Sequence, residues 1–265
     1  MKTALLLTCC LVMTLGAQPC FAQQSEEELA KAVQNPIANL ISLPLQNNTN
    51  FNIGPDNRTQ NVLNIQPVWP FSRGDWNIIT RTIAPIITQP DLASSSGSTS
   101  GLGDINMTAF LSPAKSQEVT WGVGPILSFP TATDDALGSK KWWAGPSAVF
   151  LIQPSPWVVG VLANNLWSFA GDDERGDVNA FLLQYFVNYN LRDGWYLLSA
   201  PILTANWKAD DGQQWTIPFG GGLGRVFRVG KQPINAQVSG YWNAEKPDLG
   251  PDWQLRAQVQ FLFPK

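Results

Sequence analysis

The chain has 265 residues, and its 17 basic and 20 acidic side chains give a formal net charge of −3 at pH 7, without any histidine. The absence of histidine excludes catalytic systems that need an imidazole base, and it removes the commonest metal ligand. A slightly acidic chain without a basic cluster is not expected to bind nucleic acid.

The first 22 residues have the pattern of an export signal. Lys2 precedes a mostly apolar run, Ala4–Leu15, and the letters CFA place Ala22 directly before the expected cleavage site. The apolar run is too short to span a bilayer as a helix. All three cysteines lie in this segment, so the mature protein is expected to have no disulfide and no cysteine metal site.

Residues 23–42 form the next predicted segment, and SEEELAKAV within it is the one convincing helical stretch. Ser25 and Glu28 have the spacing of a capping box, and acidic residues fill the first turn. Pro36 limits the length of the helix. We favour a short periplasmic lead-in helix, because chain termini are often loosely held; the alternative is a plug that enters the barrel predicted below.

Residues 43–265 repeat strand-like runs of alternating polarity, separated by turn residues. Many of these roughly twelve runs have the length of about 9–11 residues that a tilted membrane strand requires. The predicted strands are Leu43–Ile53, Gln60–Phe71, Trp76–Gln89, Asp104–Ser112, Val119–Phe129, Trp142–Gln153, Trp157–Phe169, Val178–Asn190, Trp195–Ala209, Trp215–Val229, Pro233–Asn243 and Trp253–Phe263.

The connections between these strands alternate in length. Tight turns such as SRGD and RDG interleave with longer polar loops such as TATDDALGSKK and AGDDERGD. Outer-membrane barrels have short periplasmic turns and longer outer loops, and their backbone groups are satisfied only if the sheet closes. The sequence therefore predicts an all-β fold, an antiparallel up-and-down transmembrane β-barrel in the outer membrane.

Aromatic residues gather at both ends of the predicted strands, as the girdles at two membrane interfaces would require. Those beside the tight turns are Trp69, Phe71, Trp76, Trp157 and Trp195, and those beside the long loops are Trp142, Trp143, Trp167, Phe169, Trp207, Trp215, Trp242 and Trp253. Internal prolines, Pro67, Pro85, Pro146 and Pro201, predict local breaks in the ladder, and the glycines of residues 220–224 leave the inward parity of that strand open.

The lumen of the barrel is the first candidate site. An arginine on the lipid face costs about 2–4 kcal/mol near the midplane, so the polar parity of a strand should face inward. The residues predicted to line the lumen are Arg81, Gln184, Asn188, Gln254, Arg256, Gln258 and Gln260. A barrel of this size lies between filled small barrels and open porins, so conduction and a packed polar core both stay open.

The acidic outer loops are the second candidate site. Their carboxylates offer oxygen ligands for Ca²⁺ or Mg²⁺ and are expected to bias the mouth toward cations. The residues are Asp134, Asp135, Asp172, Asp173, Glu174 and Asp177. The spacing is not that of a known calcium loop, and the alternative is a solvated loop with salt bridges to Lys140, Lys141 and Arg175.

Several stretches resemble a family of bacterial outer-membrane proteins: ELAKAVQNPIANLISLPLQNNTNF, TQNVLNIQPV, WGVGPILSFPTATDD, FLLQYFVNYNL and GPDWQLRAQVQFLFPK. Members of this family are described as components of the meta-cleavage (MetA) pathway of phenol degradation or as transporters, and some relatives carry the label neuromedin U. The resemblance covers nearly the whole mature chain. It implies an outer-membrane β-barrel and defines the substrate poorly.

These observations predict a narrow, porin-like passive channel for small solutes, working without a cofactor, and the family resemblance implies that these solutes are aromatic or hydrophobic. The alternative is a closed structural or adhesive barrel whose acidic outer loops bind divalent ions, lipopolysaccharide or a partner. Because outer-membrane hydrolases use a histidine base, a non-enzyme is predicted. The expected partners are outer-membrane lipid, lipopolysaccharide and the barrel assembly machinery, which reads a terminal aromatic residue; here Phe263 precedes Pro264 and Lys265.

Overall fold

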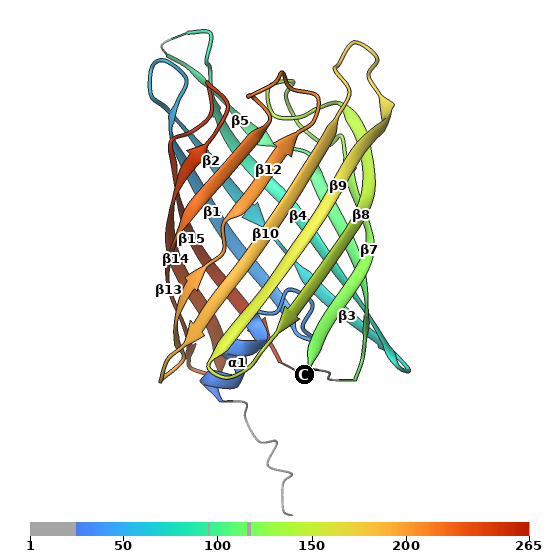
Figure 1. Cartoon of the computed structure of the whole chain (residues 1–265), viewed down its shortest axis with the longest axis vertical. Coiled ribbons are helices and arrows are strands. Elements are labelled where there is room, and N and C mark those ends of the chain that lie inside the picture. Colours follow the sequence, from blue (N-terminus) through green and yellow to red (C-terminus); the bar gives the residue numbers. More distant parts are fainter. Residues whose placement is uncertain (1–24, 95, 116–117, 265) are drawn as a thin grey trace, which may run out of the picture.

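The alternating runs of the sequence form strands that join into one closed antiparallel sheet, with a short helix at one end (Figure 1). This computed structural model describes residues 25–94, 96–115 and 118–264. The expected export signal, residues 1–22, lies outside the described residues. The elements are α1 (Glu26–Val33), β1 (Ile41–Ile53), β2 (Arg58–Ile65), β3 (Val68–Arg73), β4 (Trp76–Pro90), β5 (Ser98–Leu102), β6 (Ile105–Pro113), β7 (Val119–Phe129), β8 (Lys141–Ile152), β9 (Trp157–Gly171), β10 (Asn179–Asn190), β11 (Trp195–Ser199), β12 (Ile202–Asn206), β13 (Trp215–Val229), β14 (Gln232–Glu245) and β15 (Trp253–Phe263).

The first and last strands close the sheet. β1 pairs with β2 on one side and with β15 on the other, in a register that runs from Ile41 opposite Phe263 to Phe51 opposite Trp253. The pairs β2–β3, β5–β6 and β11–β12 each form one interrupted strand of the wall, which gives a barrel of 12 strands. The predicted antiparallel barrel is confirmed. Two of the interruptions contain Pro67 and Pro201, which cannot donate to the ladder.

The two ends of the barrel differ in their connections. At the turn end, where α1 and the C-terminus lie, tight turns join the strands (Figure 1). At the opposite loop end, the connections are longer, as the alternation predicts. One of them is shorter than expected, because residues 98–102 of the predicted loop pair with β4 as the strand β5.

The outward faces of the strands form an apolar belt with aromatic residues near both ends. On β15, Trp253, Leu255 and Val259 are 39%, 40% and 42% exposed, whereas the inward Arg256 is 4% exposed. Trp143 departs from the expected girdle. A register shift beside it turns the indole inward, where Nε1 donates to Ser139 Oγ at 2.9 Å.

The inward parity of β13 does not change along the glycine run. Gly224 and Val226 face inward, whereas Arg225 faces outward, with its guanidinium 5.1 Å from the centre of the Trp195 ring. Glycine is required at position 224 because a Cβ atom there would lie 2.3 Å from the ring of Tyr196. The Tyr196 hydroxyl donates to Asn235 Oδ1 at 2.6 Å inside the barrel.

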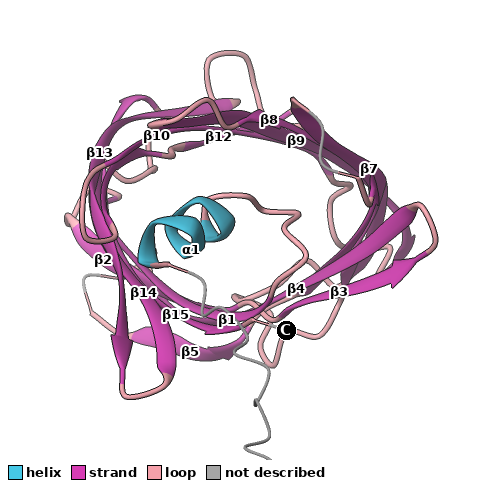
Figure 2. Ribbon diagram, turned by 90° about the horizontal axis from the view of Figure 1, so that it is seen from below, coloured by secondary structure: helices cyan, strands magenta, loops and turns pink. Residues whose placement is uncertain are grey.

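The N-terminal helix lies inside the turn end of the barrel, as the view from below shows (Figure 2). Its predicted capping box is present, with Ser25 Oγ accepting from the Glu28 amide and Glu28 Oε2 accepting from the Ser25 amide. Leu29 and Ala30 are fully buried against inward side chains of the wall, including Tyr196. The favoured interpretation of a lead-in helix outside the barrel is therefore wrong, and the alternative of a plug is correct. No helix in the described part of the chain has the length and apolar character needed to cross a membrane.

Residues 26–40 together form the segment that we call the plug. Its helix is followed by an amide pair, in which Gln34 Nε2 donates to Asn190 Oδ1 at 2.8 Å and Asn190 Nδ2 donates back at 3.3 Å. Gln153 Nε2 donates to the Lys31 carbonyl at 3.0 Å. Further along, Ile37 packs into a cluster of inward apolar side chains that includes Phe110. The plug therefore fills the turn end of the lumen through apolar packing and uncharged hydrogen bonds.

Candidate functional site

The lumen has two chemically different walls. The amide wall is formed by inward side chains of β1, β2, β14 and β15: Gln46, Asn48, Asn50, Gln60, Asn64, Asn235, Gln237, Asn243, Gln254, Gln258 and Gln260. The apolar wall is formed by inward side chains of β4 and β6–β10: Ile79, Ile83, Phe110, Ile126, Val149, Leu162, Leu166 and Leu182. A solute in the lumen would therefore meet hydrogen-bonding groups on one side and hydrocarbon on the other.

Three cavities follow these walls. The main cavity, of about 640 Å³, lies along the apolar wall and reaches the loop end at Gln213 and Pro247. The amide cavity, of about 340 Å³, lies along the amide wall, and Thr204 borders both. The plug cavity, of about 150 Å³, lies between the plug and the wall. Arg81 borders the main and plug cavities, and Arg256 borders the amide and plug cavities, so the two arginines lie where the spaces meet.

The structure places all the residues predicted to line the lumen inside it. Six of them border the plug cavity: Arg81, Gln184, Asn188, Arg256, Gln258 and Gln260. Gln254 borders the amide cavity. They come from three separate strands, β4, β10 and β15, which the closure of the barrel brings to one space.

Arg256 is held by neutral acceptors. Its Nε donates to Asn48 Oδ1 at 3.0 Å across the β1–β15 pairing. Its Nη1 donates to the Ala200 carbonyl at 2.9 Å, and its Nη2 donates to Gln254 Oε1 at 3.1 Å. The guanidinium lies 4.9 Å from the centre of the Tyr241 ring, which adds a cation–π contact. The charge is thus fixed in position without being neutralised.

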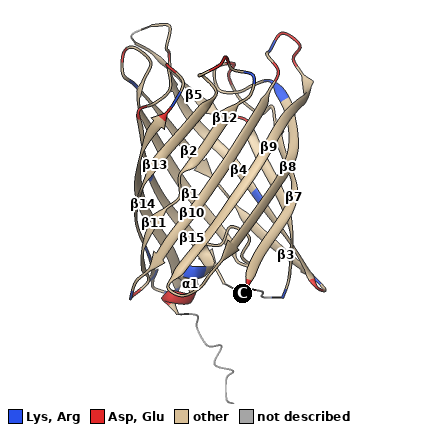
Figure 3. Cartoon of the chain, viewed as in Figure 1, with Lys and Arg blue, Asp and Glu red and all other residues tan. Residues whose placement is uncertain are grey.

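Arg81 has the same character, with its Nη2 donating to Gln66 Oε1 at 2.6 Å. None of the described residues that line the three cavities is Asp or Glu. Acidic residues lie at the two ends of the barrel, whereas its middle is largely uncharged (Figure 3). The described lining of these cavities therefore carries a net positive charge, and a positive lining attracts anions.

Sequence reasoning missed the apolar wall. On β7, and on β8 after its first residue, the inward parity carries only the small polar residues Thr120, Ser128 and Ser147 among glycines and apolar residues, so alternation marks the inward face weakly. Trp143 and Asn164 also border the main cavity and were not predicted there. The one available signal for Asn164 is that it and the aromatic Trp167 point to opposite faces of the same strand. If Trp167 belongs to the outward girdle, Asn164 faces inward.

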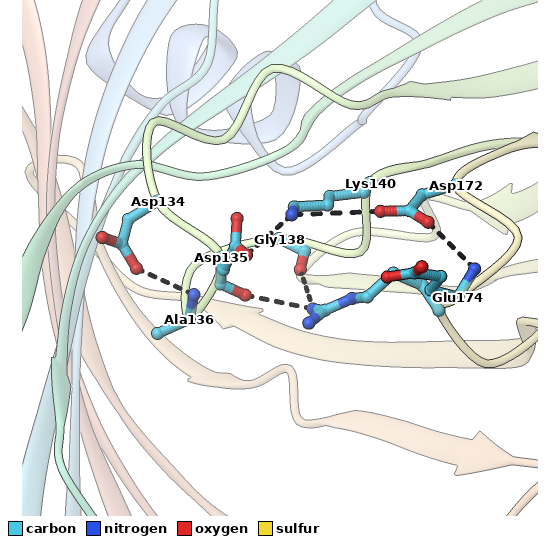
Figure 4. Close-up of polar contacts among 8 residues, drawn as sticks. Asp134, Asp135, Ala136, Gly138, Lys140, Asp172 and Glu174 are labelled. Atoms are coloured by element: carbon cyan, nitrogen blue, oxygen red, sulfur yellow. Dashed lines mark hydrogen bonds and ion pairs between the residues drawn. The ribbon is translucent and has the colours of Figure 1, made fainter.

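The acidic outer loops are joined to each other by basic side chains (Figure 4). Lys140 Nζ lies 2.6 Å from Asp135 Oδ2 and 3.9 Å from Asp172 Oδ2. Lys141 Nζ lies 3.2 Å from Asp177 Oδ1. Arg175 completes the connection by donating to the carbonyls of Asp135 at 3.0 Å and of Gly138 at 2.7 Å.

The remaining loop carboxylates make local turn contacts. Asp134 Oδ1 accepts from the Ala136 amide at 2.9 Å, and Asp172 Oδ1 accepts from the Glu174 amide at 2.9 Å. Asp173 makes no contact with this set. Among residues 25–94, 96–115 and 118–264, no group of three or more acidic, histidine or cysteine side chains is arranged to hold a metal ion. The structure thus favours the salt-bridged alternative over the divalent-ion site, and the expected bias of the mouth toward cations stays a prediction.

The loop ion pairs predict a pH dependence. The hydrogen bond from Lys140 lowers the pKa of Asp135 below its usual value of 3.8, and the bond from Lys141 does the same for Asp177. A carboxylate with a lowered pKa stabilises the folded state fully above its unfolded pKa and loses this effect as the pH falls through the folded pKa. Protonation of Asp177 removes its ion pair with Lys141, which joins the two loops, whereas the bonds from Arg175 to backbone carbonyls do not depend on pH. The two loops are therefore expected to keep their full contact down to about pH 4 and to become more loosely joined below it.

Spin labels on cysteines at Ala136 and Gly176 would measure the distance between the loops as the pH falls. A Lys140→Gln, Lys141→Gln variant serves as the control and is expected to show a wider, pH-independent distribution. Loops that separate between pH 7 and pH 5 in the unaltered sequence would contradict this prediction.

Comparison with known proteins identifies the fold. Neither a protein-family model nor a curated protein matches the sequence. Among solved structures, the chain is similar to an outer membrane channel from Pseudomonas putida F1, with 19% identity, a TM-score of 0.64, and coverage of 84% of this chain and 94% of the other. The chain has the fold of an outer-membrane β-barrel. The resemblance to the phenol-degradation family and its label neuromedin U are not confirmed.

Two other matches are more distant. The toluene transporter TodX from Pseudomonas putida has 10% identity and a TM-score of 0.39, over 90% of this chain and 91% of its own. Outer membrane phospholipase A from Escherichia coli has 14% identity and a TM-score of 0.44, over 92% of this chain and 99% of its own. The prediction of a non-enzyme is corrected by the second match, because barrels of this general shape include an enzyme. At these TM-scores neither match supplies an argument for a particular activity in this chain.

Proposed function

We propose that the protein is a passive outer-membrane channel for small, uncharged, largely apolar solutes. The observation that carries this proposal is the main cavity, which reaches the loop end and is lined on one side by Phe110, Ile126 and Leu162. An aromatic or aliphatic solute would bury its body against these side chains. The similarity to an outer membrane channel supports the same class of function.

The proposed partners follow from the outer surface. The apolar belt, with exposed side chains such as Leu255 and Val259, would contact outer-membrane lipid, and the charged loop end would contact lipopolysaccharide. Phe263 projects outward at the end of β15 with 45% exposure, so it is available to the barrel assembly machinery before insertion.

The second candidate function is a closed structural or adhesive barrel. The plug favours it, because Leu29 and Ile37 fill the turn end of the lumen and leave no straight passage. Three of the carboxylates that would bind ions, lipopolysaccharide or a partner in this alternative, Asp135, Asp172 and Asp177, are paired with Lys140 and Lys141 instead. We therefore place the channel first.

Uptake of N-phenylnaphthylamine, an uncharged aromatic dye that fluoresces in membranes, tests the proposal. Cells with the protein are expected to take up the dye faster than cells lacking it. Thr204→Trp, which places an indole between the main and amide cavities, is expected to remove most of that gain. Leu203→Trp, one residue away on the opposite parity, is the matched control and should retain it. Equal uptake with and without the protein would contradict the channel and favour the closed barrel.

A further inference from the structure

Two prolines face each other in the middle of the wall. Pro125 on β7 lies directly opposite Pro146 on β8, and both side chains point outward. In an antiparallel pair, opposed residues either exchange two N–H···O bonds or direct these groups to the strands beyond. Prolines have no N–H group, so Pro125 and Pro146 do not exchange hydrogen bonds with each other. Their backbone groups point away from the pair, and each proline therefore fails to donate a hydrogen bond to the next strand, β6 for Pro125 and β9 for Pro146.

The ladder is interrupted at both of these neighbours. Between β6 and β7, pairing stops after Thr108–Ile126 and resumes at Leu111–Val123. Between β8 and β9, pairing stops after Ala144–Trp167 and resumes at Ser147–Asn164. The register is the same before and after each interruption. These are therefore gaps in otherwise continuous pairings, at one height of the barrel.

Two inward positions at this height carry no side chain. Gly124 and Gly145, which precede the two prolines, occupy the inward positions. The carbonyl oxygens of Ala109 and Asn165, which lack a proline donor, lie where the Cβ atoms of these glycines would be, at 1.8 Å and 1.7 Å. The wall is therefore one backbone thick here, and it is held by fewer hydrogen bonds than elsewhere.

Cavities lie on both sides of this thin wall. Outside, an apolar depression of about 690 Å³ is lined by Val123, Pro146 and Ala163 among others, and it reaches the two glycines. Inside lies the main cavity of about 640 Å³. Ser147 and Asn164, the first paired residues beside the β8–β9 gap, border both spaces.

A second, independent observation concerns the hydrogen bonding of the Asn164 side chain. This side chain is 92% buried, since 8% is exposed, and its Oδ1 atom has no hydrogen-bond partner. A buried acceptor without a partner costs roughly 1–3 kcal/mol, so its retention points to a donor supplied from outside the chain. Asn164 borders both the main cavity and the depression, so this acceptor belongs to the part of the wall that separates the two spaces.

We propose that the β8–β9 gap is a lateral passage through which solutes move from the main cavity into the bilayer. This inference rests on the proposed channel function and names its exit and its solute class. The solute has an apolar body, which suits the apolar wall and the depression, and one N–H or O–H donor, which Asn164 Oδ1 accepts. The plug favours this route, because it fills the turn end of the lumen.

A disulfide clamp tests the passage. Ala148 and Ala163 are direct partners on the outward faces of β8 and β9, next to the gap. In the Ala148→Cys, Ala163→Cys protein, oxidation is expected to reduce uptake of N-phenylnaphthylamine to the rate of cells lacking the protein, and reduction should restore it. The control pair is Val238→Cys with Ala257→Cys, direct partners on β14 and β15, where oxidation should change nothing. Pro146→Val, which restores the missing donor to β9, should slow uptake without any cross-link.

Asn164→Leu, of similar volume, tests the recognition of the donor. It is expected to slow uptake of N-phenylnaphthylamine, which has an N–H group, and to leave uptake of diphenylhexatriene, which has none, unchanged. If the clamped, oxidised protein and the Pro146→Val protein take up dye at the unaltered rate, the lateral passage is wrong while the channel stands. If the unaltered protein gives no uptake above background, the channel itself fails.

Discussion

Removal of residues 26–38 is expected to raise the single-channel conductance in planar bilayers by at least about threefold, because it clears the filled turn end of a twelve-stranded lumen. The plug is held by the burial of Leu29 and Ile37 and by the Gln34–Asn190 amide pair. It makes no ion pair with the wall among the described contacts. The wall strands close without it, since β1 and β15 pair directly.

A substitution provides the same test without shortening the chain. Leu29→Asp places a carboxylate at a fully buried position, which costs several kcal/mol unless the helix leaves the lumen. Its conductance is expected to approach that of the deletion. Glu27→Lys, at an exposed position of the same helix, changes the charge of the helix more than Leu29→Asp does. It should nevertheless leave conductance near the unaltered value. A correctly inserted Leu29→Asp protein with unaltered conductance would show that the plug does not limit the passage.

Replacement of Arg256 by Glu is expected to abolish the preference of the lumen for anions over cations. Arg256 and Arg81 border connected cavities whose described lining contains no acidic residue, so one reversal removes the positive field. The substitution also removes the shorter of the two hydrogen bonds to Asn48 Oδ1 and to the Ala200 carbonyl, which keep only the longer bonds from Gln46 at 3.3 Å and from Gln184 at 3.4 Å, and it buries a carboxylate in place of a guanidinium. Lower thermal stability in detergent is therefore expected as well.

Reversal potentials under a salt gradient measure this preference. Arg225→Glu is the matched control, because Arg225 faces outward over Trp195 and should leave the reversal potential unchanged. Arg256→Gln keeps one donor and should give an intermediate value. An Arg256→Glu protein that retains the anion preference would place the selective part of the lumen elsewhere.

Most of the wall could be predicted from the sequence. The strands β7, β13 and β15 begin and end at the predicted residues, because alternating polarity and turn residues act locally. The capping box of α1 is equally local. The position of α1 is not, because an eight-residue helix with a buried face does not specify what buries it. Only the closed barrel supplies the inward side chains, such as Tyr196 and Val226, against which it packs.

The candidate site was predictable where polarity alternates and not where both faces of a strand are apolar. Arg256 and Gln258 could be assigned to the lumen because lipid excludes charge from the other parity. The inward Leu162 could not, because both parities of its strand are largely apolar. The carboxylates of Asp135 and Asp177 suggested an ion site, and their pairing with lysines depends on how two loops meet across the mouth.

The hydrogen bond from Arg256 to Asn48 joins residues 208 positions apart in the chain, and it crosses the seam between the first and last strands. This hydrogen bond cannot form while the C-terminal strand is still unpaired. The Arg256 side chain therefore takes up its position in the same step that closes the wall. Long-range pairing of this kind is slow, because the whole intervening chain must be in place first. A barrel whose seam is still open has an unpaired strand edge, and its Arg256 side chain lacks the contact with Asn48. Closure of the seam completes the wall and positions this charge in one step.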